Sequence, residues 1–235
     1  QRTYNGGMAS DWQGLMSGVF ANVLKDAVVD AQMFVNLGLI HEGRVIRYWD
    51  SFLDWMEKWG SPLFGWYVWD KLNGMTGDWG GRFAPAHEWV FHFTRTSMKP
   101  SKTVATKHSG KWVGTGQRQK DGTLKKFTGS GDLINAFKIP DSVVRLSPQK
   151  GGIKGHPAPF PVALPATFIR GWSDVAVWLD PFAGSGTTMI AAEQLTRAAY
   201  LMELDPRYCD VICQRWETLT GKKGFEFDRY IQRLS

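Results

Sequence analysis

The chain has 235 residues, of which 43% are hydrophobic, and this is enough to bury the core of one large α/β domain. Its formal charge of +6 at pH 7 favours an anionic partner such as nucleic acid, although an excess of this size also aids solubility. No signal peptide, internal repeat or apolar stretch of membrane-spanning length is recognisable. We therefore expect a soluble cytoplasmic protein that does not enter a membrane.

Apolar periodicity divides the chain into helices and strands. In chain order, the expected helices cover residues 11–25, 45–56, 164–170, 187–195 and 206–219. The expected strands cover residues 31–40, 63–71, 88–95, 175–179 and 198–202. The run at 175–179 is continuously apolar, so we expect that strand to be buried.

A basic segment lies in the middle of the chain, where Asp121 is the only acidic residue between Arg95 and Lys126. The Asp121-Gly122 pair between polar runs predicts a β-hairpin, which could place basic side chains in a major groove. Lysines there would contact phosphates, while an Arg-Gln pair could read base edges; a solvated loop is the alternative interpretation. The candidate DNA-binding residues are Lys107, Lys111, Arg118, Gln119, Lys120, Lys125 and Lys126.

A glycine-rich turn joins the strand at 175–179 to the helix at 187–195, which is where α/β sheets bind ligands. The turn reads Asp180-Pro181-Phe182-Ala183-Gly184-Ser185-Gly186-Thr187-Thr188. Its glycines would let a ligand approach the backbone and the first amides of the helix. No lysine follows Gly186, which excludes a phosphate-binding P-loop, and the third small residue of a dinucleotide fingerprint is missing, which disfavours NAD.

Two carboxylates indicate which cofactor the turn binds. Glu203 ends the next strand, where an acidic side chain can accept hydrogen bonds from both ribose hydroxyls. Asp180 would repel a pyrophosphate but attract the α-amino group of a methionine moiety, so S-adenosylmethionine fits this pattern best. The candidate residues of the turn and the following strand are Asp180, Pro181, Phe182, Gly184, Ser185, Gly186, Thr187 and Glu203.

Three sequence blocks in a fixed order resemble the β-class DNA amino-methyltransferases, which modify adenine at N6 or cytosine at N4. The blocks are His156-Pro157-Ala158-Pro159-Phe160-Pro161, Asp180 to Thr188, and Glu203-Leu204-Asp205-Pro206-Arg207-Tyr208. The resemblance implies a Rossmann-like sheet in permuted order with a basic target-recognition insertion, S-adenosylmethionine as cofactor and duplex DNA as substrate. It also places His156, Pro157 and Phe160 against the cofactor.

The resemblance further implies a division of the chain into three parts. Residues 1–94 would form the catalytic-side half, 95–140 the target-recognition insertion and 141–235 the S-adenosylmethionine-binding half. A bacterial or phage-encoded enzyme is implied, and both a homodimer and a restriction endonuclease partner are compatible with the family. Adenine N6 is the preferred target, with cytosine N4 as the alternative.

The family's catalytic tetrapeptide, an Asp, Asn or Ser followed by Pro-Pro and an aromatic residue, has no match here, because the chain contains no Pro-Pro pair. Its role is to orient the target amine and to stack on the extruded base. Either a catalytic strand belongs upstream of Gln1, which we favour, or the chain is a non-catalytic DNA-binding relative. The catalytic residues are therefore unknown.

Two other motifs do not indicate metal binding. Cys209 and Cys213 share one helix face without a second cysteine pair or a nearby histidine, which is typical of buried packing. The segment from His87 to His92 has one residue too many for a zinc-binding helix and strand-like sequence around it. We expect no metal.

Overall fold

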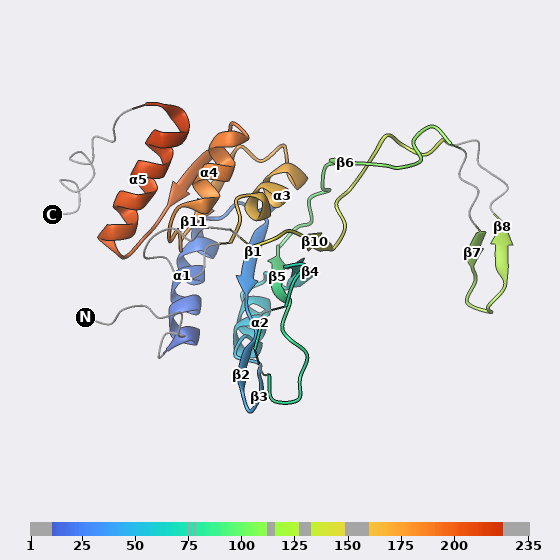
Figure 1. The fold of residues 1–235 in the computed structure, drawn as a ribbon, viewed down its shortest axis with the longest axis horizontal. Helices are drawn as coiled ribbons and strands as arrows, with labels where there is room; N and C mark the ends of the chain where they lie inside the picture. Colours follow the sequence, from blue (N-terminus) through green and yellow to red (C-terminus); the bar gives the residue numbers. More distant parts are fainter. Residues whose placement is uncertain are drawn as a thin grey trace.

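In the computed structural model of the protein, the described residues are 11–74, 76–77, 79–111, 116–126, 133–148 and 160–222. The helices are α1 (Trp12–Asp26), α2 (Asp50–Lys58), α3 (Ala163–Gly171), α4 (Thr187–Gln194) and α5 (Pro206–Thr220). The strands are β1 (Met33–Leu37), β2 (Ile40–Glu42), β3 (Arg44–Ile46), β4 (Leu63–Asp70), β5 (His87–Phe93), β6 (Val104–Ala105), β7 (Gly116–Arg118), β8 (Leu124–Lys126), β9 (Phe137–Lys138), β10 (Val143–Arg145), β11 (Val177–Asp180) and β12 (Ala198–Leu201). Figure 1 shows their arrangement.

Four strands form the larger sheet, in the order β1-β5-β4-β10. β5 runs antiparallel to both β1 and β4, with Val35 opposite Phe91, whereas β10 runs parallel to β4. The sheet has alternate residues on its two faces, so each strand can contribute to two layers of core. β10 follows the basic middle of the chain and so returns it to the first half of the fold.

Helices α1 and α2 cover one face of this sheet. Their contribution to the core consists of Met16, Phe20 and Leu24 from α1 and Phe52 and Met56 from α2. Phe91 and Phe93 of β5 are fully buried against them. Fully burying a side chain of this size stabilises the fold by about 1.5–3 kcal/mol, which makes this aromatic cluster the principal core of the first half.

The second sheet consists of β11 and β12, which run parallel and are connected through α4. One face packs on helices: Trp178 and Ala199 contact the α3 and α4 core, and Leu201 contacts the cluster that contains Ile212 of α5. The opposite face is open among the described residues, because Val177 is 53% and Leu179 49% exposed. The prediction of a buried strand at 175–179 is therefore wrong: only one side of β11 has a helical layer over it.

The two sheets adjoin each other through β1 and β11. Each of these strands lies at the edge of its sheet in the described part of the chain. The ring of Phe34 in β1 stacks on that of Trp178 in β11 at a centroid distance of 6.5 Å, and Phe168 of α3 also packs on Phe34. Helix α3 thus bridges the two halves.

The helix expected over 45–56 is wrong in its first part. Val45 and Ile46 belong to β3, which pairs antiparallel with β2, and the helix begins only at Asp50. Gly43 adopts a φ of +69°, the left-handed conformation that a tight hairpin turn requires and that glycine adopts without strain. The apolar spacing of Val45 and Ile46 fitted a helix as well as a strand, and the turn decided between them.

The strand expected over 31–40 is shorter, because β1 ends at Leu37 and Ile40 belongs to β2, and the other predicted elements are confirmed with small shifts at their ends. They include the hairpin at Asp121-Gly122, where β7 and β8 pair with Arg118 opposite Leu124. Gly122 has a φ of +85°, and the Asp121 carboxylate accepts hydrogen bonds from the backbone and side chain of Thr123. Figure 1 shows this hairpin at the opposite end of the molecule from α5.

Candidate cofactor-binding site

The carboxyl ends of β11 and β12 lie side by side because the two strands are parallel and in register. Asp180 is paired with Leu201, so that Glu203 follows only two residues beyond the aligned position. The glycine-rich turn leaves the same edge and leads into α4. The structure thus brings together both predicted carboxylates and the predicted turn, in the place where parallel sheets bind ligands.

Asp180 holds the two ends of the turn together. Its Oδ1 accepts a hydrogen bond from the backbone N–H of Phe182 at 3.0 Å, and its Oδ2 accepts one from Thr188 Oγ1 at 2.6 Å. The first bond closes the turn after β11, and the second connects it to the first turn of α4. A charged acceptor makes both hydrogen bonds stronger than neutral ones.

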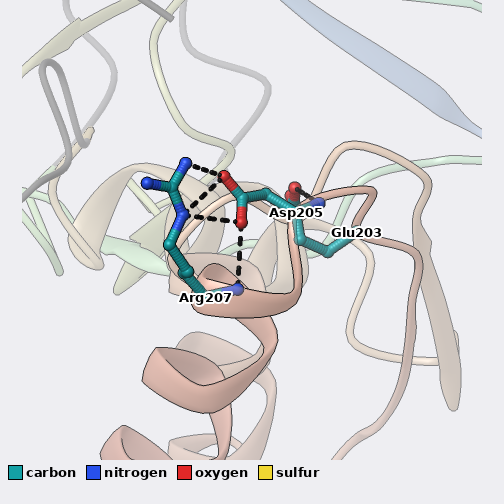
Figure 2. Close-up of polar contacts among 3 residues, drawn as sticks. All are labelled: Glu203, Asp205 and Arg207. Carbon is teal, nitrogen blue, oxygen red and sulfur yellow. Dashed lines mark hydrogen bonds and ion pairs between the residues drawn. The ribbon is translucent and has the colours of Figure 1, made fainter. Parts of the chain in front are cut away.

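Glu203 connects the same turn to the segment after β12. Its Oε2 accepts a hydrogen bond from the N–H of Gly184 at 2.7 Å, and its Oε1 accepts one from the N–H of Asp205 at 2.9 Å. Figure 2 shows the contact with Asp205. Each carboxylate oxygen has a further lone pair, so Glu203 can still accept hydrogen bonds from ligand hydroxyls while it holds the turn.

Asp205 serves the helix that follows rather than the cofactor turn. It is the N-cap of α5, where its Oδ1 accepts from the N–H of Arg207 at 2.9 Å, and Pro206 occupies the first helical position. The Arg207 guanidinium forms an ion pair with Asp205 at 2.5 Å, as Figure 2 shows. Hydrogen bonds from Arg207 hold the pKa of the Asp205 carboxyl below its usual value. Helix capping therefore accounts for the aspartate at position 205.

Glycine is favoured at positions 184 and 186 of the turn for partly different structural reasons. Both have positive φ, +52° at Gly184 and +76° at Gly186, where side chains are strained. Gly186 is also the N-cap of α4, and a Cβ there would lie 2.9 Å from Cγ1 of Ile212. The turn is therefore packed closely against α5 at this point.

Arg215 of α5 also contacts the turn, and it was not predicted from the sequence. Its Nη1 donates to Ser185 O at 2.5 Å, to Ser185 Oγ at 3.2 Å and to Thr187 Oγ1 at 3.3 Å. Burial lowers the pKa of Arg215. In the sequence, Arg215 is one of several polar residues on an amphipathic helix, and only its spacing of three from Ile212 could have placed it on the same face.

The remaining predicted cofactor residues are placed in different ways. Pro181 and Phe182 form the first part of the turn, and the Phe182 side chain is 45% exposed beside it. Phe160 is half-buried and packs in the cluster of Leu164, Phe168 and Trp172 around α3. His156 and Pro157 lie outside the described residues, so the predicted approach of that loop to the cofactor stays a prediction.

The predicted DNA-binding residues lie between Lys107 and Lys126, in the β7–β8 hairpin and the segment before it. Lys107, Lys111, Arg118, Gln119 and Lys120 are exposed. Lys125 and Lys126 belong to β8, where they pair with Gln117 and Gly116 of β7. In Figure 1 this hairpin is well separated from the turn after β11.

Two further findings concern the described part of the chain. It contains no group of three or more His, Cys, Asp and Glu side chains placed to hold a metal ion. Within the same residues, every helix is too short or too polar to cross a bilayer.

The parallel β11-α4-β12 unit, its glycine turn and the paired carboxylates define the Rossmann-like methyltransferase class. Within this class, the sequence model of the DNA methylase family, which covers N6 and N4 methyltransferases, matches residues 4–214. The chain belongs to this family. The resemblance seen in the three sequence blocks is thereby confirmed.

Individual relatives agree with this assignment. The orphan methyltransferase M.BamHII of Bacillus amyloliquefaciens is 28% identical over 148 residues, which cover 57% of this chain and 55% of that protein. The type II methyltransferase M.PvuII of Proteus hauseri is 43% identical over 86 residues, which cover 32% of this chain and 26% of that protein. The matched part of this chain thus spans about half or less of the length of these curated relatives.

Solved structures show the same fold. The structure of the cytosine-N4-specific PvuII DNA methyltransferase has a TM-score of 0.65 at 18% identity, covering 90% of this chain and 75% of that one. The M1.HpyAVI–SAM complex has a TM-score of 0.53 at 18% identity, covering 85% and 81%. The predicted α/β Rossmann-like methyltransferase fold is therefore confirmed.

Proposed function

We propose that this chain binds S-adenosylmethionine at the turn between β11 and α4, as part of an enzyme that methylates an exocyclic amine in duplex DNA. The observation that carries the proposal is the placement of Asp180 and Glu203 at adjacent carboxyl ends of β11 and β12. Glu203 would accept hydrogen bonds from the ribose hydroxyls and Asp180 would attract the α-amino group. When bound, the cofactor supplies an electrophilic methyl group on sulfur.

The donor and acceptor pattern of the site suits this cofactor. Glu203 and Asp180 already use oxygen lone pairs on backbone amides of the turn, which orients both carboxylates before any ligand arrives. Preorganised groups lose little entropy on binding, so the affinity gained per contact is greater. The similarity to the M1.HpyAVI–SAM complex supports the same cofactor.

Adenine N6 remains our first candidate for the methylated position. Cytosine N4 is the second candidate, and it is supported by the relation to PvuII methyltransferase, whose structure is described as cytosine-N4-specific. The projecting β7–β8 hairpin, with exposed Arg118 and Lys120, is our candidate for the element that contacts the DNA.

The open edges of β11 and β1 suggest where the catalytic tetrapeptide acts. Both strands lack a partner on one side among the described strands, and they adjoin each other through Phe34 and Trp178. A strand seated parallel to β11 at this edge would end beside the glycine turn, because parallel strands end at the same edge of a sheet. We propose that a strand with the family's tetrapeptide would act at this position. A non-catalytic DNA-binding relative is the competing interpretation.

The cofactor part of the proposal is tested by calorimetric titration of S-adenosylmethionine into the chain, with NAD as the control ligand. We expect saturable binding of S-adenosylmethionine alone. Glu203→Gln should weaken it about tenfold, the scale of one charge-assisted hydrogen bond to the ribose, while Glu57→Gln, at an exposed position on α2, serves as a carboxylate control. A folded chain that binds neither ligand would refute the cofactor assignment.

The target is tested by mass spectrometry of DNA from cells that express the gene. N6-methyladenine above the background of a host lacking its own methyltransferases would support the first candidate, and N4-methylcytosine the second. Unmodified DNA from cells with abundant folded protein would favour the non-catalytic module instead.

A further inference from the structure

The guanidinium of Arg215 in helix α5 makes polar contacts with the proposed cofactor turn. Arg215 Nη1 donates to the backbone oxygen of Ser185 at 2.5 Å and lies within hydrogen-bonding distance of the hydroxyls of Ser185 and Thr187. The side chains that it reaches are buried, with Ser185 1% and Thr187 4% exposed. These contacts join two segments 28 to 30 residues apart in the sequence.

A second contact comes from the same face of α5. Ile212, three residues before Arg215, lies so close to Gly186 that a Cβ on that glycine would be 2.9 Å from its Cγ1. Glu203 meanwhile accepts from the N–H of Gly184. The turn is therefore held by an acceptor at Gly184, by a donor at Ser185 and by apolar packing at Gly186.

The charge of Arg215 is unusual for a residue that only stabilises the fold. Burial lowers the pKa of Arg215, and among the described residues it forms no ion pair with a carboxylate. Its hydrogen-bond partners are neutral oxygens. Partial burial of a cation without a counter-ion costs free energy, which stability alone gives no reason to retain.

We infer that Arg215 is a positioning residue, which keeps the Gly184–Thr187 turn in the conformation that binds S-adenosylmethionine. This inference rests on the proposed cofactor and concerns how the site is kept in shape. A ligand that requires one conformation binds more weakly in proportion to the fraction of molecules that lack it. Loss of Arg215 would therefore raise the dissociation constant of every ligand that uses the turn by the same factor.

The test compares Arg215→Gln and Arg215→Lys with Arg170→Gln, which replaces an exposed arginine on α3. Each full-length chain is titrated with S-adenosylmethionine and with 5′-methylthioadenosine, which has the adenosine but no amino-acid group. We expect Arg215→Gln to weaken both ligands about tenfold or more, the scale of hydrogen bonds from a charged donor. Arg215→Lys should lose less affinity for both ligands, because its ammonium group can still donate to Ser185 O. Arg170→Gln should bind both ligands like the wild type.

Hydrogen exchange provides a readout that does not depend on affinity. In Arg215→Lys, which keeps the charge and most of the stem, the amides of residues 184–188 should exchange faster while those of β1 and β5 stay protected. This variant also carries the test if Arg215→Gln does not fold. Unchanged exchange together with affinity within twofold of the wild type would overturn the inference.

The outcomes separate this inference from the proposed function. If the wild-type chain binds no S-adenosylmethionine, the cofactor assignment fails before any variant is compared. If the wild type binds and the Arg215 variants bind equally well, only the positioning role fails. A loss confined to S-adenosylmethionine, with 5′-methylthioadenosine unaffected, would also overturn it, because that pattern indicates direct contact with the amino-acid group.

Discussion

Two carboxylates beside the turn stabilise its conformation and would also bind the ligand. Asp180 and Glu203 would contact the cofactor, yet both also accept hydrogen bonds from amides of the turn. Their removal would therefore change the shape of the site as well as its charge. A reduced affinity in either variant measures both effects together, whereas a substitution at a glycine of the turn tests the shape alone.

Gly186→Ala should destabilise the protein more than Gly60→Ala. The two glycines have almost the same φ, +76° and +75°, but a Cβ on Gly60 would meet no atom within 4 Å, whereas on Gly186 it would collide with Ile212. We expect a loss of about 1 kcal/mol for Gly60→Ala from the left-handed backbone. Gly186→Ala should lose a further ~1–3 kcal/mol from overpacking.

Chemical denaturation of both variants measures this difference in the free energy of unfolding. Adding Ile212→Val to Gly186→Ala should recover part of the loss, because the smaller side chain gives the new methyl group room. Equal losses at the two glycines would show that α5 withdraws easily from the turn.

At the scale of elements, a buried polar network joins β4 and β5 to the segment just before β1. His92 is fully buried, with its Nδ1 3.1 Å from the Tyr67 hydroxyl and its Nε2 2.9 Å from Gln32 Oε1. Gln32 in turn donates to Thr94 Oγ1 at 3.0 Å. Since Gln32 Oε1 only accepts, the proton of the neutral ring is on Nε2, and Nδ1 accepts from Tyr67.

This network predicts acid sensitivity of the fold. Burial lowers the pKa of His92 to about 4, below the ordinary value of 6.5, so the unfolded chain binds a proton that the folded protein does not. The free energy of unfolding contributed here is present above pH 6.5 and is lost as pH falls toward 4. The loss is on the order of 3 kcal/mol in total, at up to about 1.4 kcal/mol per pH unit.

Urea denaturation at intervals between pH 7 and pH 4 measures this slope. For His92→Gln, the free energy of unfolding should change less with pH in that window, whatever its value at pH 7. His108→Gln, at an exposed position, should keep the wild-type slope. A His92→Gln profile parallel to the wild type would show that other groups cause the acid sensitivity.

Strand β11 shows why a strand is easier to predict from the sequence than its degree of burial. The apolar run at 175–179 does form β11, but its neighbours decide how much of it is buried. Helices cover one face, and β12 pairs with only one edge. Periodicity reports what a segment can bury, and the other elements determine what it does bury.

At the scale of the whole molecule, the proposed DNA-binding hairpin and the proposed cofactor site lie far apart. The proposed cofactor turn lies near α5, whereas the β7–β8 hairpin projects from the other end, as Figure 1 shows. A net charge of +6 acts on DNA at long range, but basic side chains on a projecting hairpin can contact phosphates directly.

We expect Arg118→Gln with Lys120→Gln to weaken duplex binding at low salt and to lower the slope of log affinity against log salt by roughly one to two. The control is Lys25→Gln with Lys58→Gln, which removes the same charge from exposed positions on α1 and α2. Fluorescence anisotropy with a labelled duplex measures both slopes. If the two double variants change the slope equally, binding depends on net charge and not on the hairpin.

The sequence by itself determined the five helices and most of the longer strands, the hairpin at Asp121-Gly122 and the glycine turn with its two carboxylates. These are local features: each depends on periodicity, turn residues or short spacings that only one backbone arrangement satisfies. The tertiary structure decided that one face of β11 is open and that Arg215 reaches Ser185. These features depend on which segments meet in space, because burial and long-range hydrogen bonds are properties of pairs of elements and not of either one alone.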